Sequence, residues 1–97
     1  MSTETTTPPD RQLPLGRTLM TPGVQREIDP ASLAICLGLH ELCQWGDCCP
    51  EDAASNDAAV RDGDRVIGVH SDINGVKFWI ITEGDRSVTT ALLPEEY

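Results

Sequence analysis

The stretch RVIGVHSDINGVKFWIITEGDRSVTTALL, residues 65–93, decides the fold of this 97-residue chain. Its apolar residues recur with a period of about two, which is the period of a half-buried strand. Asn74-Gly75 separates two such runs and is a strong signal for a tight β-hairpin turn. A second turn at residues 83–86 precedes a third run. The sequence therefore predicts a three-stranded antiparallel meander.

The hairpin turn also predicts which side chains share a face of the meander. A two-residue turn pairs Val69 with Ile80, on the face that we expect to pack under a long helix. Because the other face is too apolar to be bare, we expect the N-terminal segment or another chain to cover it. That other face would carry Val66, His70, Trp79 and Ile81.

The stretch DPASLAICLGLHELCQWG, residues 29–46, predicts the long helix. Asp29 can accept hydrogen bonds from the first free amides, and Pro30 suits the first helical position because no donor is needed there. We expect the helix to span residues 30–44 and to stop at Gly46. Leu33 and Leu37 widen the apolar arc of this helix, so the helix is buried on several sides or has a partner. Its expected core face consists of Ala31, Ile35, Leu39 and Leu42.

The remaining segments complete a single small domain. Residues 50–61 predict a second helix, with acidic residues in its first turn and Gly63 beyond its end. Residues 15–20 predict a short strand. Residues 1–13 have no apolar periodicity and predict a disordered tail. We therefore expect one α+β domain over residues 14–97, with a short N-terminal strand, two helices and the meander packed on the long helix.

Charge is the strongest compositional signal. Sixteen acidic and seven basic residues give a formal net charge of −9. Within residues 41–64, Arg61 is the sole base among seven acids. Such a field repels nucleic acid and attracts basic protein surfaces, although acidic surfaces also serve solubility alone. Together with Trp79, these acids are the candidate partner-binding residues: Glu41, Asp47, Glu51, Asp52, Asp57, Asp62 and Asp64.

The stretch LHELCQWGDCCPED raises the question of a metal or redox site. Cys36, His40 and Cys43 recur at helical spacing. Cys48 or Cys49 could supply a fourth ligand. Structural zinc sites, however, draw pairs of ligands from tight turns, whereas three ligands on one rigid helix converge poorly. Adjacent cysteines also lack the C-x-x-C spacing of redox pairs. We therefore expect thiols that pack as small apolar side chains, with no metal and no cofactor.

No catalytic constellation accompanies these residues. His40 has no nucleophile at a recognisable spacing, and GDRS at residues 84–87 lacks the glycines and lysine of a phosphate-binding loop. We therefore expect a protein that is not an enzyme. The longest apolar stretch, residues 31–43, is shorter than the roughly 20 residues of a membrane span, and no secretory leader is recognisable. The sequence thus predicts a cytoplasmic protein with reduced cysteines.

Most of residues 15–97 resemble a known group of proteins. The match rests on LGRTLMTPG, on a histidine five residues before WGD, on EDAASN and above all on WIITEGDRSVTTALLPEEY, residues 79–97. This pattern is similar to that of small acidic proteins encoded on bacterial plasmids, integrated elements and phages, which often carry a restriction-modification label. The resemblance implies a mobile-element setting and no mechanism. Three cysteines, Cys36, Cys43 and Cys48, depart from the pattern, which further disfavours zinc. The matching residues are His40, Trp45, Gly46, Asp47, Asp52, Asn56, Trp79, Asp85, Arg86 and Tyr97.

Two functional classes fit these expectations. The first is an acidic interaction protein of a mobile element that blocks a host nucleic-acid-handling defence, as anti-CRISPR and anti-restriction proteins do, by mimicking nucleic acid in a basic groove. The alternative is a regulatory or accessory module, with a homodimer as one option, that binds a protein through the apolar helix or the Trp79 face. The charge disfavours direct binding of nucleic acid in either case.

Overall fold

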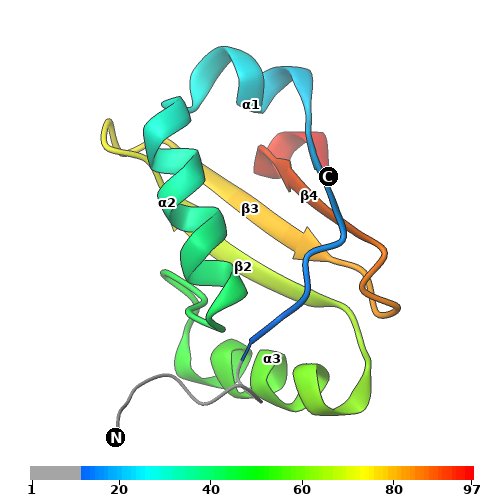
Figure 1. Cartoon of the computed structure of the whole chain (residues 1–97). Coiled ribbons are helices and arrows are strands. Elements are labelled where there is room, and N and C mark those ends of the chain that lie inside the picture. The colour runs from blue at the N-terminus through cyan, green and yellow to red at the C-terminus, as the bar shows by residue number, and fades with distance from the viewer. Residues whose placement is uncertain (1–11) are drawn as a thin grey trace, which may run out of the picture.

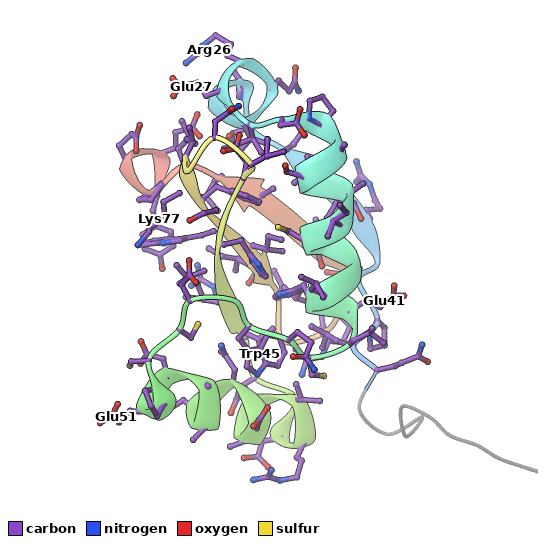
Figure 2. All side chains as sticks on the ribbon, turned by 90° about the vertical axis from the view of Figure 1, so that its left-hand side faces the viewer. Arg26, Glu27, Glu41, Trp45, Glu51 and Lys77 are labelled. Carbon is purple, nitrogen blue, oxygen red and sulfur yellow. The ribbon has the colours of Figure 1, made fainter. Side chains whose placement is uncertain are left out.

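The computed structural model describes residues 12–97 and has the predicted α+β class, with helices packed on a four-stranded sheet (Figure 1). α1 and α3 lie at opposite ends of the molecule in both views, and α2 runs along the sheet between them (Figures 1 and 2). The elements are, in chain order, β1 (Arg17–Met20), α1 (Pro22–Glu27), α2 (Pro30–Glu41), α3 (Pro50–Asp62), β2 (Val66–Ser71), β3 (Lys77–Thr82), β4 (Val88–Leu92) and the 3-10 helix η2 (Pro94–Glu96).

The sheet contains the predicted meander and one strand more. β2, β3 and β4 are antiparallel neighbours, whereas β1 joins β4 in parallel, so the strand order is β1-β4-β3-β2. Where the chain enters β1, the Arg17 amide donates to the Ser87 carbonyl at 3.0 Å. Where it leaves β1, the Thr21 amide donates to the Ala91 carbonyl at 3.1 Å. We had expected the N-terminal segment or another chain to cover the outer face of the meander; the strand in the N-terminal segment instead extends the edge of the sheet.

The turn between β2 and β3 is a three-residue loop and not the predicted two-residue turn. Asp72 and Val76 flank the loop and share a backbone hydrogen bond of 3.0 Å. The Asp72 carboxylate accepts hydrogen bonds from the amides of Asn74 and Val76, at 2.9 Å each. Gly75 ends the turn with a left-handed φ of 81°, which this class of hairpin requires. An aspartate two residues before Asn-Gly thus favours the longer loop.

The longer loop shifts the register of β2 by one residue, so the faces predicted for β2 are wrong. Val69 pairs with Trp79 and not with Ile80. Because side chains alternate along a strand, the shift moves every β2 side chain to the opposite face. Val66 and His70 are buried on the inner face, and Val69 lies on the outer face beside Trp79. The faces of β3 are as predicted.

α2 begins as predicted and ends three residues earlier than predicted. The Asp29 carboxylate caps its first turn, and Pro30 is its first residue. At the other end, Cys43 has a left-handed φ of 63°, and the Gln44 amide donates to the Leu39 carbonyl at 2.8 Å. This 6→1 hydrogen bond belongs to the Schellman motif that ends many helices. A cysteine takes the position that usually belongs to glycine, which explains why the sequence predicted a longer helix.

The buried face of α2 also differs from the predicted one. Leu33, Cys36 and His40 are buried, whereas Ile35 and Leu39 are 65% and 40% exposed. The helix carries large apolar residues on several sides, so spacing alone did not distinguish two competing arcs. The arc that contains His40 is the buried one. A fully buried imidazole needs a hydrogen bond, and His40 finds it with the Thr82 hydroxyl inside the domain.

Two hydrophobic clusters fill the domain. The first joins α1 and α2 to β3 and β4, and Phe78 and Ile80 in it have no exposed surface. The second lies between α3, β2 and the loop after α2, and contains Leu13, Cys43, Trp45, Ala59 and Val66. Each cluster is small, so single large side chains at their centres carry much of the apolar burial.

The folded domain begins earlier than predicted. Leu13 is fully buried, and its amide donates to the Glu41 carbonyl at 2.7 Å. The predicted tail of residues 1–13 therefore ends too late, and its first part, residues 1–11, lies outside the described residues. Within residues 12–97, no helix is long and apolar enough to cross a membrane.

α3, which matches the second predicted helix to within one residue, helps to cover the free edge of β2. The Asn56 side chain donates to the Ile67 carbonyl (2.8 Å) and accepts from its amide (3.1 Å). Farther along the same edge, the Val69 amide donates to the Trp45 carbonyl (3.0 Å), and the Asp47 amide donates to the Val69 carbonyl (2.7 Å). These contacts occupy edge groups that would otherwise be open to a strand from another chain.

Candidate partner-binding site

The seven candidate acids do not form one continuous surface. Glu41 is the last residue of α2, whereas the other six acids lie in the loop before α3, in α3 itself and just after it. In Figure 2, Glu41 and Glu51 point away from the molecule on opposite sides of the view. Glu41 is therefore separate from the acids of the first turn of α3.

Asp57 has a structural role. It is half-buried, and its carboxylate accepts a hydrogen bond of 2.9 Å from the indole Nε1 of the buried Trp45. This bond ties α3 to the loop that follows α2. A charged acceptor makes such a bond stronger than a neutral one. Asp57 was predicted as a partner-binding acid, but its carboxylate is engaged with Trp45 and does not face outward with the other acids.

The acids at the C-terminal end of α3 lie near cations. Arg86 donates from Nη1 to the Asp64 carbonyl at 2.7 Å and from Nη2 to the Ala59 carbonyl at 2.9 Å. A guanidinium at the carbonyl end of a helix also interacts favourably with the helix dipole. The positive charge of Arg86 therefore lies at the C-terminal end of α3, where the exposed residues Asp62 and Asp64 also lie, and it weakens the negative field there.

The N-terminal end of α3 is different. Asp47, Glu51 and Asp52 are all exposed, and no lysine or arginine of the described residues forms an ion pair with them. Burial raises the pKa of the nearby Cys48 thiol, and the negative charges of Asp52 and Asp47 raise that pKa further. Both carboxylates therefore act on the same small region. We call the surface of Asp47, Glu51 and Asp52 the acidic end.

A hollow of about 380 Å³ adjoins the acidic end. It lies between α3 and the outer face of β2 and β3, and its lining includes Ile67, Val69 and Trp79 from the sheet and Asp52 from α3. Two predicted candidates, Asp52 and Trp79, are thus brought together. Sequence reasoning placed Trp79 on the outer face but missed Ile67 and Val69, because the predicted register put them on the inner one. The aspartate before Asn-Gly was the signal that could have corrected this.

Tyr97 closes one side of the hollow. Its ring meets that of Trp79 edge-on, with ring centroids 5.4 Å apart and planes at 66°. The Arg65 guanidinium lies 5.4 Å from the centre of the Tyr97 ring, and Arg65 Nη2 donates to the Tyr97 hydroxyl at 3.0 Å. Arg65 also forms an exposed ion pair with Glu83 at 3.9 Å. Tyr97 is therefore held between an indole and a guanidinium.

Cys36, His40 and Cys43, the cysteine and histidine stripe that starts on α2, have their side chains in different surroundings. Cys36 packs in the first hydrophobic cluster and Cys43 in the second, while His40 Nε2 lies 2.9 Å from the Thr82 hydroxyl. Within the described residues, no three His, Cys, Asp or Glu side chains are arranged to hold a metal ion. Burial also raises the pKa of the Cys36 thiol, which opposes the thiolate that zinc needs. The absence of zinc from the protein stays a prediction.

His40 belongs to a buried polar chain under α2. The Thr89 hydroxyl donates to the Leu15 carbonyl (2.7 Å) and lies 2.7 Å from the Thr82 hydroxyl. Because each hydroxyl has one proton, Thr82 donates to Thr89, and His40 must donate from Nε2 to Thr82. His40 is thus the neutral Nε2–H tautomer. With no exposed surface, it is a structural residue and is not accessible to a substrate.

His70 lies beside His40 in the same region. The ring centroids are 6.4 Å apart, and a Cβ at Gly68 would lie 2.9 Å from His40 Nδ1 and 3.0 Å from His70 Nε2. The two rings therefore need glycine between them. Burial, with a smaller effect from the neighbouring His70, lowers the pKa of His40 to about 3. Burial also lowers the pKa of His70, although the Asp47 carboxylate acts in the opposite direction.

Comparison of the chain with protein-family models, with curated proteins and with solved structures gave no match. The resemblance to small acidic proteins of mobile elements therefore stays a prediction.

Proposed function

We propose that this chain is a non-catalytic interaction protein of a mobile genetic element and acts in the cytoplasm. It would block a host defence system that handles nucleic acid, as anti-CRISPR and anti-restriction proteins do. It would do so by placing its acidic end in a basic groove that otherwise holds nucleic acid. The observation that carries the proposal is the exposure of Asp47, Glu51 and Asp52 without an ion pair among the described residues.

The physical basis is competition for a positive surface. A groove that binds nucleic acid is lined by Lys and Arg, and its field attracts any surface of opposite sign. Carboxylates on the first turn of a helix can occupy such a groove without a catalytic group or a cofactor. The net charge of −9 also disfavours direct binding to nucleic acid, so we propose a protein or nucleoprotein partner.

The structure narrows the residues that should be tested. Asp57 bonds to the indole of Trp45, so changing Asp57 would mix stability with binding, and Asp62 and Asp64 lie at the end of α3 that carries the positive charge of Arg86. Glu51 and Asp47 do not line the hollow, and the one hydrogen bond of the Asp47 carboxylate, from the Ser71 hydroxyl, is long at 3.4 Å. The test variant is therefore Asp47→Asn with Glu51→Gln.

The experiment measures protection of phage or plasmid DNA from a host nuclease or CRISPR effector in cells that produce this chain. The test variant should lose protection and keep its circular dichroism spectrum and melting temperature, because exposed acids change stability by no more than about 0.5 kcal/mol. A matched control, Glu27→Gln with Glu95→Gln, removes the same charge from exposed acids elsewhere and should protect fully. Equal protection by wild type, test variant and control would refute the proposal.

A second candidate function is a regulatory or accessory module that binds a protein through an apolar face. Ile35 and Leu39 on α2 favour it, because they are 65% and 40% exposed. An apolar hollow of about 300 Å³ between α1 and α2 adjoins this helix. Complexes led by apolar contact keep their affinity when salt is raised, whereas complexes led by charge lose it. A pull-down from the host at two salt concentrations therefore distinguishes the two functions, and light scattering across a concentration series tests for a homodimer.

A further inference from the structure

We propose that the hollow beside Trp79 binds an arginine side chain of a protein partner. This inference rests on the proposed function, because it names the side chain by which the acidic end would anchor a basic surface. The size of the hollow, its aromatic lining and its charge each support an arginine.

The size and lining suit a long side chain with a flat cationic end. The hollow has a volume of about 380 Å³, within the range of about 300–1,000 Å³ that is typical of ligand pockets. Ile67 and Val69 provide apolar surface for the methylene groups. Trp79 is half-buried, and its indole is the best cation–π acceptor among side chains. A guanidinium can also stack on an aromatic ring, which an ammonium cannot.

The side of the hollow that α3 forms favours a cation. Two charged side chains line the hollow: the Asp52 carboxylate, which has no ion pair among residues 12–97, and the Arg65 guanidinium, whose charge Glu83 partly offsets at 3.9 Å. A carboxylate and a guanidinium can form two parallel hydrogen bonds, so Asp52 fixes the end of the side chain that Trp79 stacks against. Asp47 adds to this field, since its charge and that of Asp52 both reach the Cys48 thiol in the lining of the hollow.

Arg65 shows that this aromatic pair already accepts a guanidinium. It contacts the Tyr97 ring and hydroxyl, and Glu83 partly offsets its charge at 3.9 Å. The cation–π contact of Arg65 is with Tyr97 and not with Trp79. In the proposed complex, a second guanidinium stacks on the Trp79 indole and pairs with the Asp52 carboxylate, which both line the hollow.

The test uses the full chain labelled with ¹⁵N and two short peptides of matched shape. Acetyl-Gly-Arg-Gly-amide carries the guanidinium, and acetyl-Gly-citrulline-Gly-amide replaces it by a neutral urea. We expect the arginine peptide to shift the Trp79 indole resonance and the Ile67 and Val69 amides, and the citrulline peptide to shift them at least about tenfold more weakly at equal concentration. The Trp79→Phe variant assigns the indole signal, because Trp45 gives the only other one.

Two variants test the assigned contacts. Asp52→Asn should weaken binding of the arginine peptide by about threefold or more, and Trp79→Leu should abolish the shifts at Val69. Glu27→Gln removes the same single charge at the far end of the molecule and should bind like wild type (Figure 2). Equal binding of the two peptides, or full binding by Asp52→Asn, would overturn the proposal, and circular dichroism establishes that each variant is folded.

The outcome separates this inference from the proposed function. If the arginine peptide does not bind while protection in cells still depends on Asp47 and Glu51, the hollow is not the anchor and the proposed function stands. If the peptide binds as expected while the wild-type chain gives no protection, the hollow is a cation site and the proposed function is wrong.

Discussion

Lowering the pH from 7 to 5 should destabilise this domain through His40. The imidazole is fully buried, donates from Nε2 to Thr82 and has no hydrogen-bond partner for Nδ1 among the described residues. A proton added at Nδ1 would place an uncompensated charge in the core, beside His70. Burial, with a smaller effect from His70, accordingly lowers the pKa of His40 from 6.5 to about 3.

The magnitude follows from proton linkage. Because the folded-state pKa of His40 lies below its unfolded value of 6.5, the neutral imidazole contributes stability that is fully present above that pH and is lost as the pH falls toward about 3. Between pH 7 and pH 5 the loss amounts to about 2 kcal/mol, because about 1.36 kcal/mol is lost for each pH unit below the unfolded-state pKa. The lowered pKa of His70 acts in the same direction. Carboxylates titrate mainly below this window.

The assay is urea unfolding at half-unit steps from pH 7.5 to 5, combined with NMR titration of the two imidazoles. His40→Leu serves as the comparison: whatever its absolute stability, its free energy of unfolding should change about 2 kcal/mol less over this range than that of the wild type. Protonation at lower pH also reduces the net charge of −9 and with it the repulsion within the folded chain, which raises stability. The NMR titration of His40 is therefore the decisive measurement. A His40 imidazole that titrates near pH 6.5 in the folded protein would refute the reasoning.

Three further predictions concern the core, a surface contact and metal content. Leu33→Ala should cost about 2–5 kcal/mol, whereas Leu39→Ala should cost no more than about 1 kcal/mol because Leu39 is 40% exposed; urea unfolding that ranks them the other way would reverse our orientation of α2. Asp57→Ala should lower stability by about 1–3 kcal/mol, since the buried Trp45 indole loses its charged acceptor, and an unchanged melting temperature would return Asp57 to the binding surface. Metal analysis of the purified chain should find no stoichiometric zinc, and one zinc per chain would reverse our interpretation of the stripe on α2.

Much of the fold could be predicted from the sequence where local signals agree. Asp29 and Pro30 begin α2 as expected, and Gly63, with a left-handed φ of 74°, ends α3. The antiparallel order of β2, β3 and β4 likewise follows from runs of β-forming residues separated by turns. Caps and turns are encoded by a few neighbouring residues, so one sequence suffices to find them.

The errors have two physical sources. A side chain changed a turn, because the Asp72 carboxylate binds the amides of the loop and lengthens it. A long-range contact chose the face of α2, because His40 meets Thr82, 42 residues away. Both errors affected the candidate site. The wrong register placed the β2 residues that line the hollow on the inner face, and the assumed burial of Leu39 meant that the exposed side of α2 was not predicted. Pairings across the sheet, such as that of β1 with β4, leave no mark in local spacing.

The net charge overstates the acidic surface, because several carboxylates hold the fold together. Hydrogen bonds from backbone amides, first that of Asp29 and then that of Val76, lower the pKa of Asp72. Hydrogen bonds from Ser87 lower the pKa of Asp85 within its turn, and hydrogen bonds from Thr21 and from the Leu93 amide lower the pKa of Glu96.

The acids of the acidic end do not have such structural hydrogen bonds. Asp52 and Glu51 show no side-chain hydrogen bond within residues 12–97, and Asp47 accepts one long bond of 3.4 Å from the Ser71 hydroxyl. The first turn of a helix favours acids through its dipole, but that effect falls off within one turn and amounts to about 0.3–1 kcal/mol per charge at the surface. This effect can account for Glu51 and Asp52, which lie in the first turn of α3, but it does not explain Asp47. Exposed acids also serve solubility, so the protection assay with the Asp47 and Glu51 variant is the measurement that distinguishes a partner-binding role of these acids from that general one.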